Sequence, residues 1–287
     1  MPTFPTPQPI HVTLELANGD ARLTATERDD TVVEVRPRDP SRKADVRAAD
    51  ETRVELGDGR LLVKTPRQGL GLSRSGEVEV TIALPAGSRL DGRTGAGDLS
   101  VEGVLGECSF KSGAGALRLG RIGQAKLISG AGDVSVEAAD GNVLVVTGSG
   151  AIRLGTVAHD AIVKSGNGAA TIGEVGGDVR VSTGNGDIII ERSHGTVVAK
   201  TAHGTIRAAA LESGEAGLRT AFGAIEIGIA EGTVAQLDVQ TERGMVRQEL
   251  EPTGTPAPDA RTVAVKARTG MGDIVVRRAA GSAAAAA

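Results

Sequence analysis

The chain has 287 residues, a formal charge of −4 and a hydrophobic fraction of 40%, enough to bury one long domain or two ordinary ones. It has no Trp, no Tyr and only three Phe, but 41 glycines, so aliphatic side chains must fill its interior and its backbone must turn often. The slightly acidic balance excludes a basic field that would attract nucleic acid or an anionic membrane. The single cysteine, Cys108, excludes an intramolecular disulfide, and we expect it to be a small core residue.

The N-terminal third is irregular. Residues 1–9 have neither the basic start nor the apolar run of a signal peptide, and we expect them to be flexible. Residues 10–93 contain short alternating strands with hairpin turns at "NGD" and "GDG", and we expect this segment to cap a larger structure. With no signal peptide and no apolar stretch of about 18 residues, we expect a cytoplasmic protein without a membrane span.

A turn motif recurs through residues 94–276. It begins with Ser or Thr, usually continues Gly-x-Gly, and is followed by alternating aliphatic residues, as in "TGAGDLSV" and "SGAGDVSV". Side chains two apart on a strand share a face, so the aliphatic pairs and the Ser or Thr of the turn should all point inward. Each repeat therefore predicts a strand, a bend, a second strand and a glycine turn. The turns start at Thr94, Ser112, Ser129, Thr147, Ser165, Thr183, Thr201, Thr220, Thr241 and Thr269, mostly 18 residues apart.

This periodicity predicts an all-β fold, a single parallel β-solenoid of about ten coils with strands about 4.8 Å apart. We expect it to be right-handed, with an irregular β cap formed by residues 10–93. Inside residues 94–276, the stretch 251–262 is expected to be an insertion loop, and 277–287 a disordered tail. A narrow coil also explains the missing indole rings, which would overfill it.

Two motifs carry a family resemblance. They are "VEVTIALPAGSRLDGRTGAGDLSVEG", from Val78 to Gly103, and the series of Ser/Thr-Gly-x-Gly-Asp turns that follows it. With these motifs the chain resembles the bacterial DUF4097 family of β-strand repeats, whose members are regarded as adhesins. The resemblance implies a repeat fold, whereas the adhesive role in the family's description gains no support from this sequence, in which we expect no export signal. The later turns "TAHG", "TAFG" and "TERG" depart from the motif because they lose their first glycine.

Several kinds of site are disfavoured. The glycine turns run into strands and no Gly-Lys-Ser/Thr occurs, so a nucleotide phosphate loop is not expected. The turn aspartates directly follow a glycine, at a position that does not suit calcium, and they are spaced too far apart to act as a catalytic pair. We expect them to accept hydrogen bonds from turn amides. The sequence thus predicts no catalytic residue, no metal, no cofactor and no small-molecule ligand.

Outward positions in the middle of the repeats are apolar where polar residues would be usual. Such a row must be covered, either by the N-terminal segment folding back or by another subunit. We expect a second interface at the last coil, whose strand edges would be unpaired. The candidate interaction residues are Ile128, Leu144, Val146, Ile162 and Val198 in the row, and Ile274 and Val276 in the last coil.

These features predict a non-catalytic scaffold that associates with itself, as a homo-oligomer, or with another protein. Two alternatives stay open. One is a surface adhesin or polysaccharide-binding module. The other is an enzyme of the β-helix polysaccharide lyase or hydrolase type, which would need two carboxylates in one groove.

Overall fold

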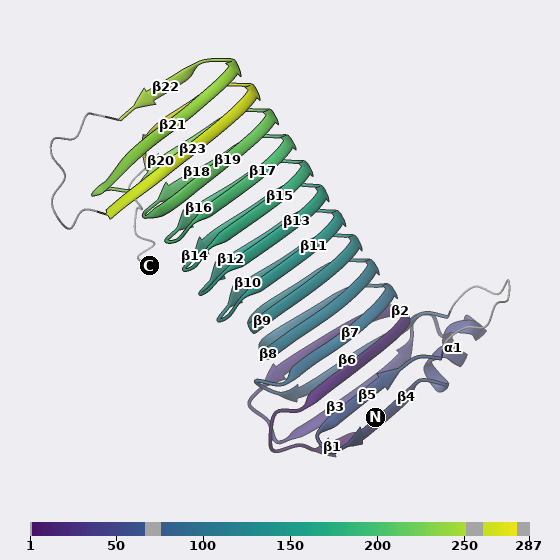
Figure 1. The fold of residues 1–287 in the computed structure, drawn as a ribbon. Coiled ribbons are helices and arrows are strands. Elements are labelled where there is room, and N and C mark those ends of the chain that lie inside the picture. Colours follow the sequence, from purple (N-terminus) through teal and green to yellow (C-terminus); the bar gives the residue numbers. More distant parts are fainter. Residues whose placement is uncertain (1, 67–75, 251–260, 280–287) are drawn as a thin grey trace, which may run out of the picture. The chain divides into compact units, whose positions relative to one another are not determined.

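The structure, a computed structural model, describes residues 2–66, 76–250 and 261–279. The chain forms two compact units, Met1–Gly150 and Ala151–Ala287. Each unit is a parallel β-solenoid, as the sequence predicts (Figure 1). The described residues contain a single helix, α1 (Lys43–Asp50), and no helix in these ranges is long and apolar enough to cross a membrane.

The first unit contains eleven strands and α1. One turn of the coil, here called a rung, has two strands that lie in opposite sheets. The long strands β8 and β9 each pass through a corner and contribute to both sheets. The strands are β1 (Thr3–Pro5), β2 (His11–Thr26), β3 (Asp30–Pro37), β4 (Arg53–Gly57), β5 (Arg60–Lys64), β6 (Val78–Pro85), β7 (Arg89–Ala96), β8 (Leu99–Ala114), β9 (Leu117–Ala131), β10 (Val134–Ala139) and β11 (Val143–Ser149).

The second unit repeats the same rung. Its odd-numbered strands pair in parallel in one sheet and its even-numbered strands in the other. They are β12 (Ile152–Val157), β13 (Ala161–Asn167), β14 (Ala170–Val175), β15 (Val179–Asn185), β16 (Ile188–Ser193), β17 (Val197–His203), β18 (Ile206–Leu211), β19 (Gly214–Phe222), β20 (Ile225–Ile229), β21 (Thr233–Arg243), β22 (Val246–Glu249), β23 (Arg261–Met271) and β24 (Ile274–Arg278).

The predicted inward pairs form the core of each unit. In the first unit, Val134 lies over Leu117 and Val143 over Ala125, and all four side chains are buried. Cys108 is buried among them, as expected. The rungs therefore stack identical positions, and aliphatic side chains of similar size fill a narrow interior.

The glycine turns are corners of the coil. The second glycine of each turn has a positive φ, +143° at Gly186 for example, and a Cβ there would overlap the carbonyl oxygen of Gly168 on the preceding rung. Most turn hydroxyls face inward as predicted and donate to turn carbonyls, whereas the Ser165 hydroxyl has no hydrogen-bond partner among the described residues. Ser112 donates to Ala114 at 3.0 Å, and Thr220 donates to Gly204 at 3.0 Å.

The N-terminal segment does more than cap the first unit. Strand β2 is itself a rung, paired on one side with β5 and β6 and on the other with β7 and β8. Outside it, β3 and β4 run antiparallel to β6 and β5. Residues 3–5, which lie in the segment expected to be flexible, form β1 and pair antiparallel with β3. The described part of the segment, residues 10–66 and 76–93, forms the edge of the rung stack in this unit.

The last two rungs of the second unit are stacked in exchanged order, so that β23–β24 lies between β19–β20 and β21–β22. After β20 the chain lays down β21 and β22, then returns so that β23 pairs with both β19 and β21, and β24 with both β20 and β22 (Figure 1). Thr269 therefore lies between Thr220 and Thr241. The rungs therefore do not stack in sequence order here, and the connection between β22 and β23 is long enough in sequence for the chain to return one rung.

The last strand ends at Arg278, two residues beyond the predicted end of the repeats. Arg261 and Thr262, placed by prediction in a loop, begin β23. The rest of the predicted loop, residues 251–260, and most of the predicted tail, residues 280–287, lie outside the described residues.

Candidate functional site

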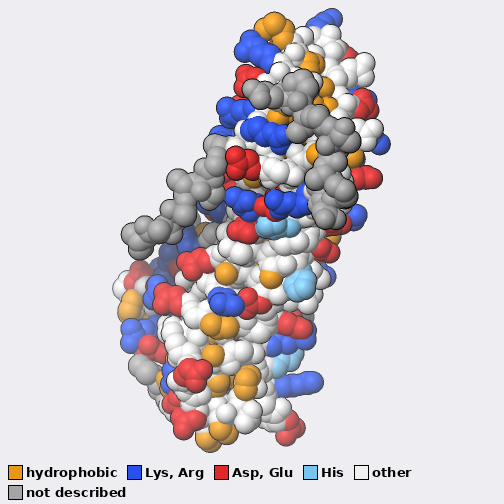
Figure 2. All heavy atoms as spheres, turned by 90° about the vertical axis from the view of Figure 1, so that its left-hand side faces the viewer, with side chains coloured by type: hydrophobic (Ala, Val, Ile, Leu, Met, Phe, Trp, Pro, Cys, Tyr) orange, Lys and Arg blue, Asp and Glu red, His pale blue; other side chains and the backbone are white. Residues whose placement is uncertain are grey.

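The predicted apolar row points outward and is half-buried. In the first unit, Val146 lies beside Ile128 on the neighbouring strand, while Leu144 lies beside Lys126. In the second unit the row is broken. Ile162 and Val198 flank Arg180, so a charged side chain separates them. The row is therefore a small apolar cluster in one unit and isolated side chains in the other. On the face seen in Figure 2, acidic and basic side chains are interspersed between the apolar ones.

The other two predicted interface residues are not at a surface. Ile274 and Val276 are both 0% exposed, since β24 is paired on both sides. The sequence places them correctly on the inward face but assigns them to the wrong rung. The rung that ends the second unit is β21–β22, which sequence reasoning did not single out.

This terminal rung leaves the solenoid interior open. On β21 the inward positions Leu237 and Val239 lie over the buried Val265 and Ala267, yet they are only half-buried themselves. On β22, Val246 lies over Ile274 and is 44% exposed. A repeat array usually ends in a polar cap, because an uncapped end exposes core side chains to water. In the described part of the second unit, no such cap covers the β21–β22 end.

The same rung offers an unpaired strand edge. Within the described residues β21 pairs only with β23, and β22 only with β24. In this solenoid the inward residues donate to the following rung, as Val179 does to Thr196 (2.8 Å) and Ile274 does to Met245 (2.9 Å). By the same alternation, the amides and carbonyls of Leu237 and Val239 point away from β23 into the open edge. Such an edge can accept another strand. We call this surface the open end.

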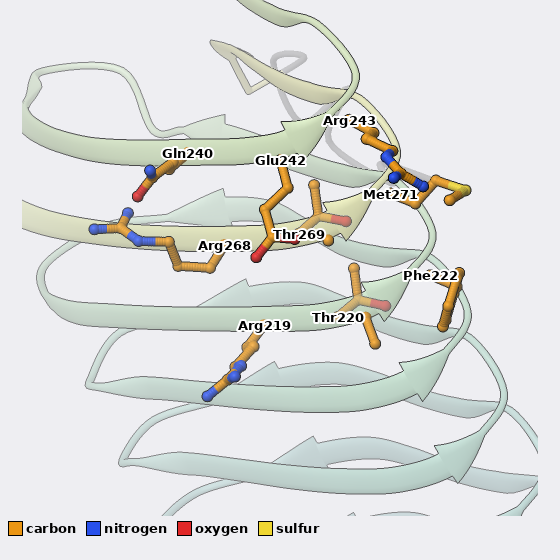
Figure 3. Close-up of a pocket in the computed structure, with 11 residues that line it drawn as sticks. Arg219, Thr220, Phe222, Gln240, Glu242, Arg243, Arg268, Thr269 and Met271 are labelled. Atoms are coloured by element: carbon orange, nitrogen blue, oxygen red, sulfur yellow. The ribbon is translucent and has the colours of Figure 1, made fainter.

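A groove of about 720 Å³ lies beside the open end (Figure 3). One wall is a ladder in which Arg219, Arg268 and Gln240 occupy the same position on successive rungs, and the opposite wall is formed by Phe222, Met271 and Arg243. The floor is shallow because Ala221 and Gly270 have little or no side chain.

The charged side chains of the groove differ in whether they form an ion pair. Arg268 is held by Asp238, to whose carboxylate it donates at 2.8 and 2.9 Å. Arg219 and Arg243 have no ion pair among the described residues, and neither has Glu242. The groove therefore carries two available guanidinium groups and one available carboxylate.

An aromatic pair continues the second wall. The rings of His203 and Phe222 stack with centroids 5.0 Å apart, and Phe222 is 49% exposed. Both lie within turns that have lost their first glycine, which is the sequence signal that could have marked this edge as different. An exposed aromatic ring beside free arginines can contact a ligand that has both an apolar face and an anionic group.

A network around Glu212 ties the exchanged rung in place. Its carboxylate accepts hydrogen bonds from Arg192 (2.7 Å) and Arg261 (2.7 Å) and contacts His194 Nδ1 (3.1 Å). Burial acts to raise the pKa of Glu212, but Arg192, His194 and Arg261 together outweigh burial and lower it. Since Arg261 begins β23, this network is a structural clamp at the point where the chain returns.

The turn aspartates act on the backbone. Asp98 accepts a hydrogen bond from the amide of Ala116 (2.8 Å), and Asp187 accepts one from Thr205 (2.7 Å). Each carboxylate thus holds the corner of the next rung. In the described ranges, no three His, Cys, Asp or Glu side chains lie close enough together to share a metal ion.

Comparison with solved structures gives distant likenesses. A candidate adhesin from Parabacteroides merdae is 10% identical with a TM-score of 0.42, over 96% of this chain and 94% of that one. A candidate adhesin from Bacteroides fragilis is 13% identical with a TM-score of 0.35, over 96% and 95% of the two chains. At such values these likenesses say nothing about what the chain binds. No curated protein sequence matches the chain.

Comparison with sequence profiles of protein families identifies the family of the chain. The sequence profile described as Toastrack DUF4097 matches residues 10–277, which covers the rungs of both units, the exchanged C-terminal pair included. The chain belongs to the Toastrack DUF4097 family.

Proposed function

We propose that the chain is a non-catalytic interaction scaffold that associates with itself through the open end. The observation that supports this most strongly is that β21–β22 combines an unpaired strand edge with half-exposed core side chains. Both features are unfavourable in water and both are removed when another strand docks. The turn carboxylates described above are engaged with backbone amides, which supports a structural role for them.

The test is the oligomeric state. The wild type should sediment as a dimer or larger species, and Val239→Pro should be monomeric, because the amide of Val239 faces the open edge and is dispensable within one chain. Circular dichroism checks that the variant is folded. Leu144→Lys/Ile162→Lys alters the outward row and should leave association unchanged. A wild type that stays monomeric at high concentration would exclude this function, and dissociation of the row variant alone would move the interface to the row.

The groove favours a second candidate function, the binding of an anionic polysaccharide. Arg219 and the exposed ring of Phe222 face a shallow channel that crosses successive rungs (Figure 3). Calorimetry with polygalacturonate should then give saturable binding that Arg219→Gln weakens, whereas neutral dextran should not bind. Equal binding of both polymers, or none, would exclude this candidate.

A further inference from the structure

We infer that two copies of the chain pair head to head, with their β21 strands antiparallel about a two-fold axis through Leu237. This inference deepens the proposed self-association, on which it rests, by naming the partner strand and its register. A two-fold contact uses the same edge of both copies, so it closes as a dimer and does not grow into a filament.

The backbone supports this register. With the axis at Leu237, residues equally far from it on either side face each other, so Leu237 meets its own copy and Ala235 meets Val239. These are inward residues, and by the alternation described above their amides and carbonyls point to the open edge. Each opposing pair can therefore exchange two hydrogen bonds, with Cα atoms about 5.5 Å apart.

The side chains support it as well. On the inward face every opposing pair is apolar or hydroxylic, because Thr233 would meet Thr241 beyond the Ala235 and Val239 pairs. The second copy then covers Leu237 and Val239 in the same way that β21 covers Val265 and Ala267. The interior of one solenoid would continue into the other, which removes the exposed core at the end of the rung stack.

The charged side chains favour this register over registers shifted by one residue. Glu231 lies in the turn just before β21 and Arg243 ends the strand, and both are six residues from Leu237, so the two side chains would come near each other at the rim of the interface, twice in a symmetric dimer. Neither side chain has an ion pair among the described residues. An axis one residue later would set Asp238 against Asp238, and an axis one residue earlier would set Val234 against Asp238. Opposite charges at the rim fix register and disfavour the alternatives.

The experiment is disulfide trapping. The only native cysteine, Cys108, is buried and serves as a silent background. Leu237→Cys should form a covalent dimer under mild oxidation, because its Cα separation across the axis suits a disulfide. Val239→Cys is the matched control, since it should face Ala235 and remain uncrosslinked. A reducing gel should return the dimer to monomer.

Charge reversal provides an independent measurement. Glu231→Arg and Arg243→Glu should each raise the dimer dissociation constant roughly tenfold, and the double variant should restore it. Crosslinking of Val239→Cys as readily as Leu237→Cys, or no rescue by the double variant, would overturn this register. A wild type that still dimerises would then keep the proposed function, whereas a monomeric wild type would end both.

Discussion

Gly92 and Phe110 face each other across β7 and β8, and the ring of Phe110 fills the space that Gly92 leaves by having no side chain. A Cβ on Gly92 would lie 2.6 Å from Cδ2 and Cε2 of that ring. Phe110 is fully buried, so the ring cannot move aside. The only phenylalanine in the first unit's core thus depends on one glycine in the adjacent rung.

Gly92→Ala should therefore destabilise the first unit by about 1–3 kcal/mol, the usual cost of overpacking a core. Urea unfolding followed by circular dichroism measures this cost. Gly57→Ala is the control, since a Cβ there has no atom within 4 Å, and it should change stability little. If Phe110→Leu in the Gly92→Ala background does not recover part of the loss, the contact is not its cause.

The corner glycines give a second prediction. Gly186→Ala should cost about 1–3 kcal/mol, because its φ of +143° is strained for any side chain and the new Cβ would meet the Gly168 carbonyl. Gly184→Ala, in the same turn, would place its Cβ 2.6 Å from the Gly166 carbonyl oxygen, but its φ lies outside the left-handed region. It should cost less than Gly186→Ala, since the next two rungs carry Ala202 and Ala221 at that position. Thermal unfolding of both variants checks the order, and equal losses would contradict the role given to φ.

Much of each solenoid could be predicted because the repeat encodes it locally. Alternation alone places Val134 and Val143 inward, and the turn hydroxyl of Thr220 follows from the same register. The order of the last rungs could not be predicted in this way. Ile274 and Val246 have the same local pattern, and only the pairing of β24 between β20 and β22 decides which one is buried.

The candidate site was missed for the same reason. The open end depends on which rung is outermost, a property of topology and not of any motif. The signals were indirect, namely the long steps from Thr220 to Thr241 and on to Thr269, and the charged turn at Glu242 and Arg243. A charged, glycine-poor repeat suits an edge better than a centre, as edge strands generally show.

Cys108 gives a third prediction. Burial, with a smaller contribution from Asp91, raises the pKa of its thiol to about 12. The thiolate is the reactive form, so the folded chain should not react with Ellman's reagent near neutral pH, and one equivalent should react in denaturant. Rapid labelling of the folded wild type would contradict the packing at this position.

The clamp at Glu212 predicts a dependence of stability on pH. Because the pKa of Glu212 in the folded chain lies below its ordinary value of 4.5, its ionisation adds stability that is fully present above that value and is lost as the pH falls through the folded-state pKa. Glu212→Gln should therefore lower the unfolding free energy by about 1.5–3 kcal/mol at neutral pH, a typical value for hydrogen bonds to a charged group. The difference from wild type should shrink in acid.

Urea unfolding at neutral pH and at about pH 3 tests this dependence, since the linkage vanishes once both states are protonated. Glu215→Gln is the matched control, an exposed carboxyl without an ion pair in the described residues, and it should show no such difference. Hydrogen exchange shows which part of the chain is destabilised. Since Arg261 begins the inserted strand β23 and is held by Glu212, the Gln variant should expose the β23 amides first. Equal loss of protection in all rungs would mean that Glu212 does not hold β23 in place.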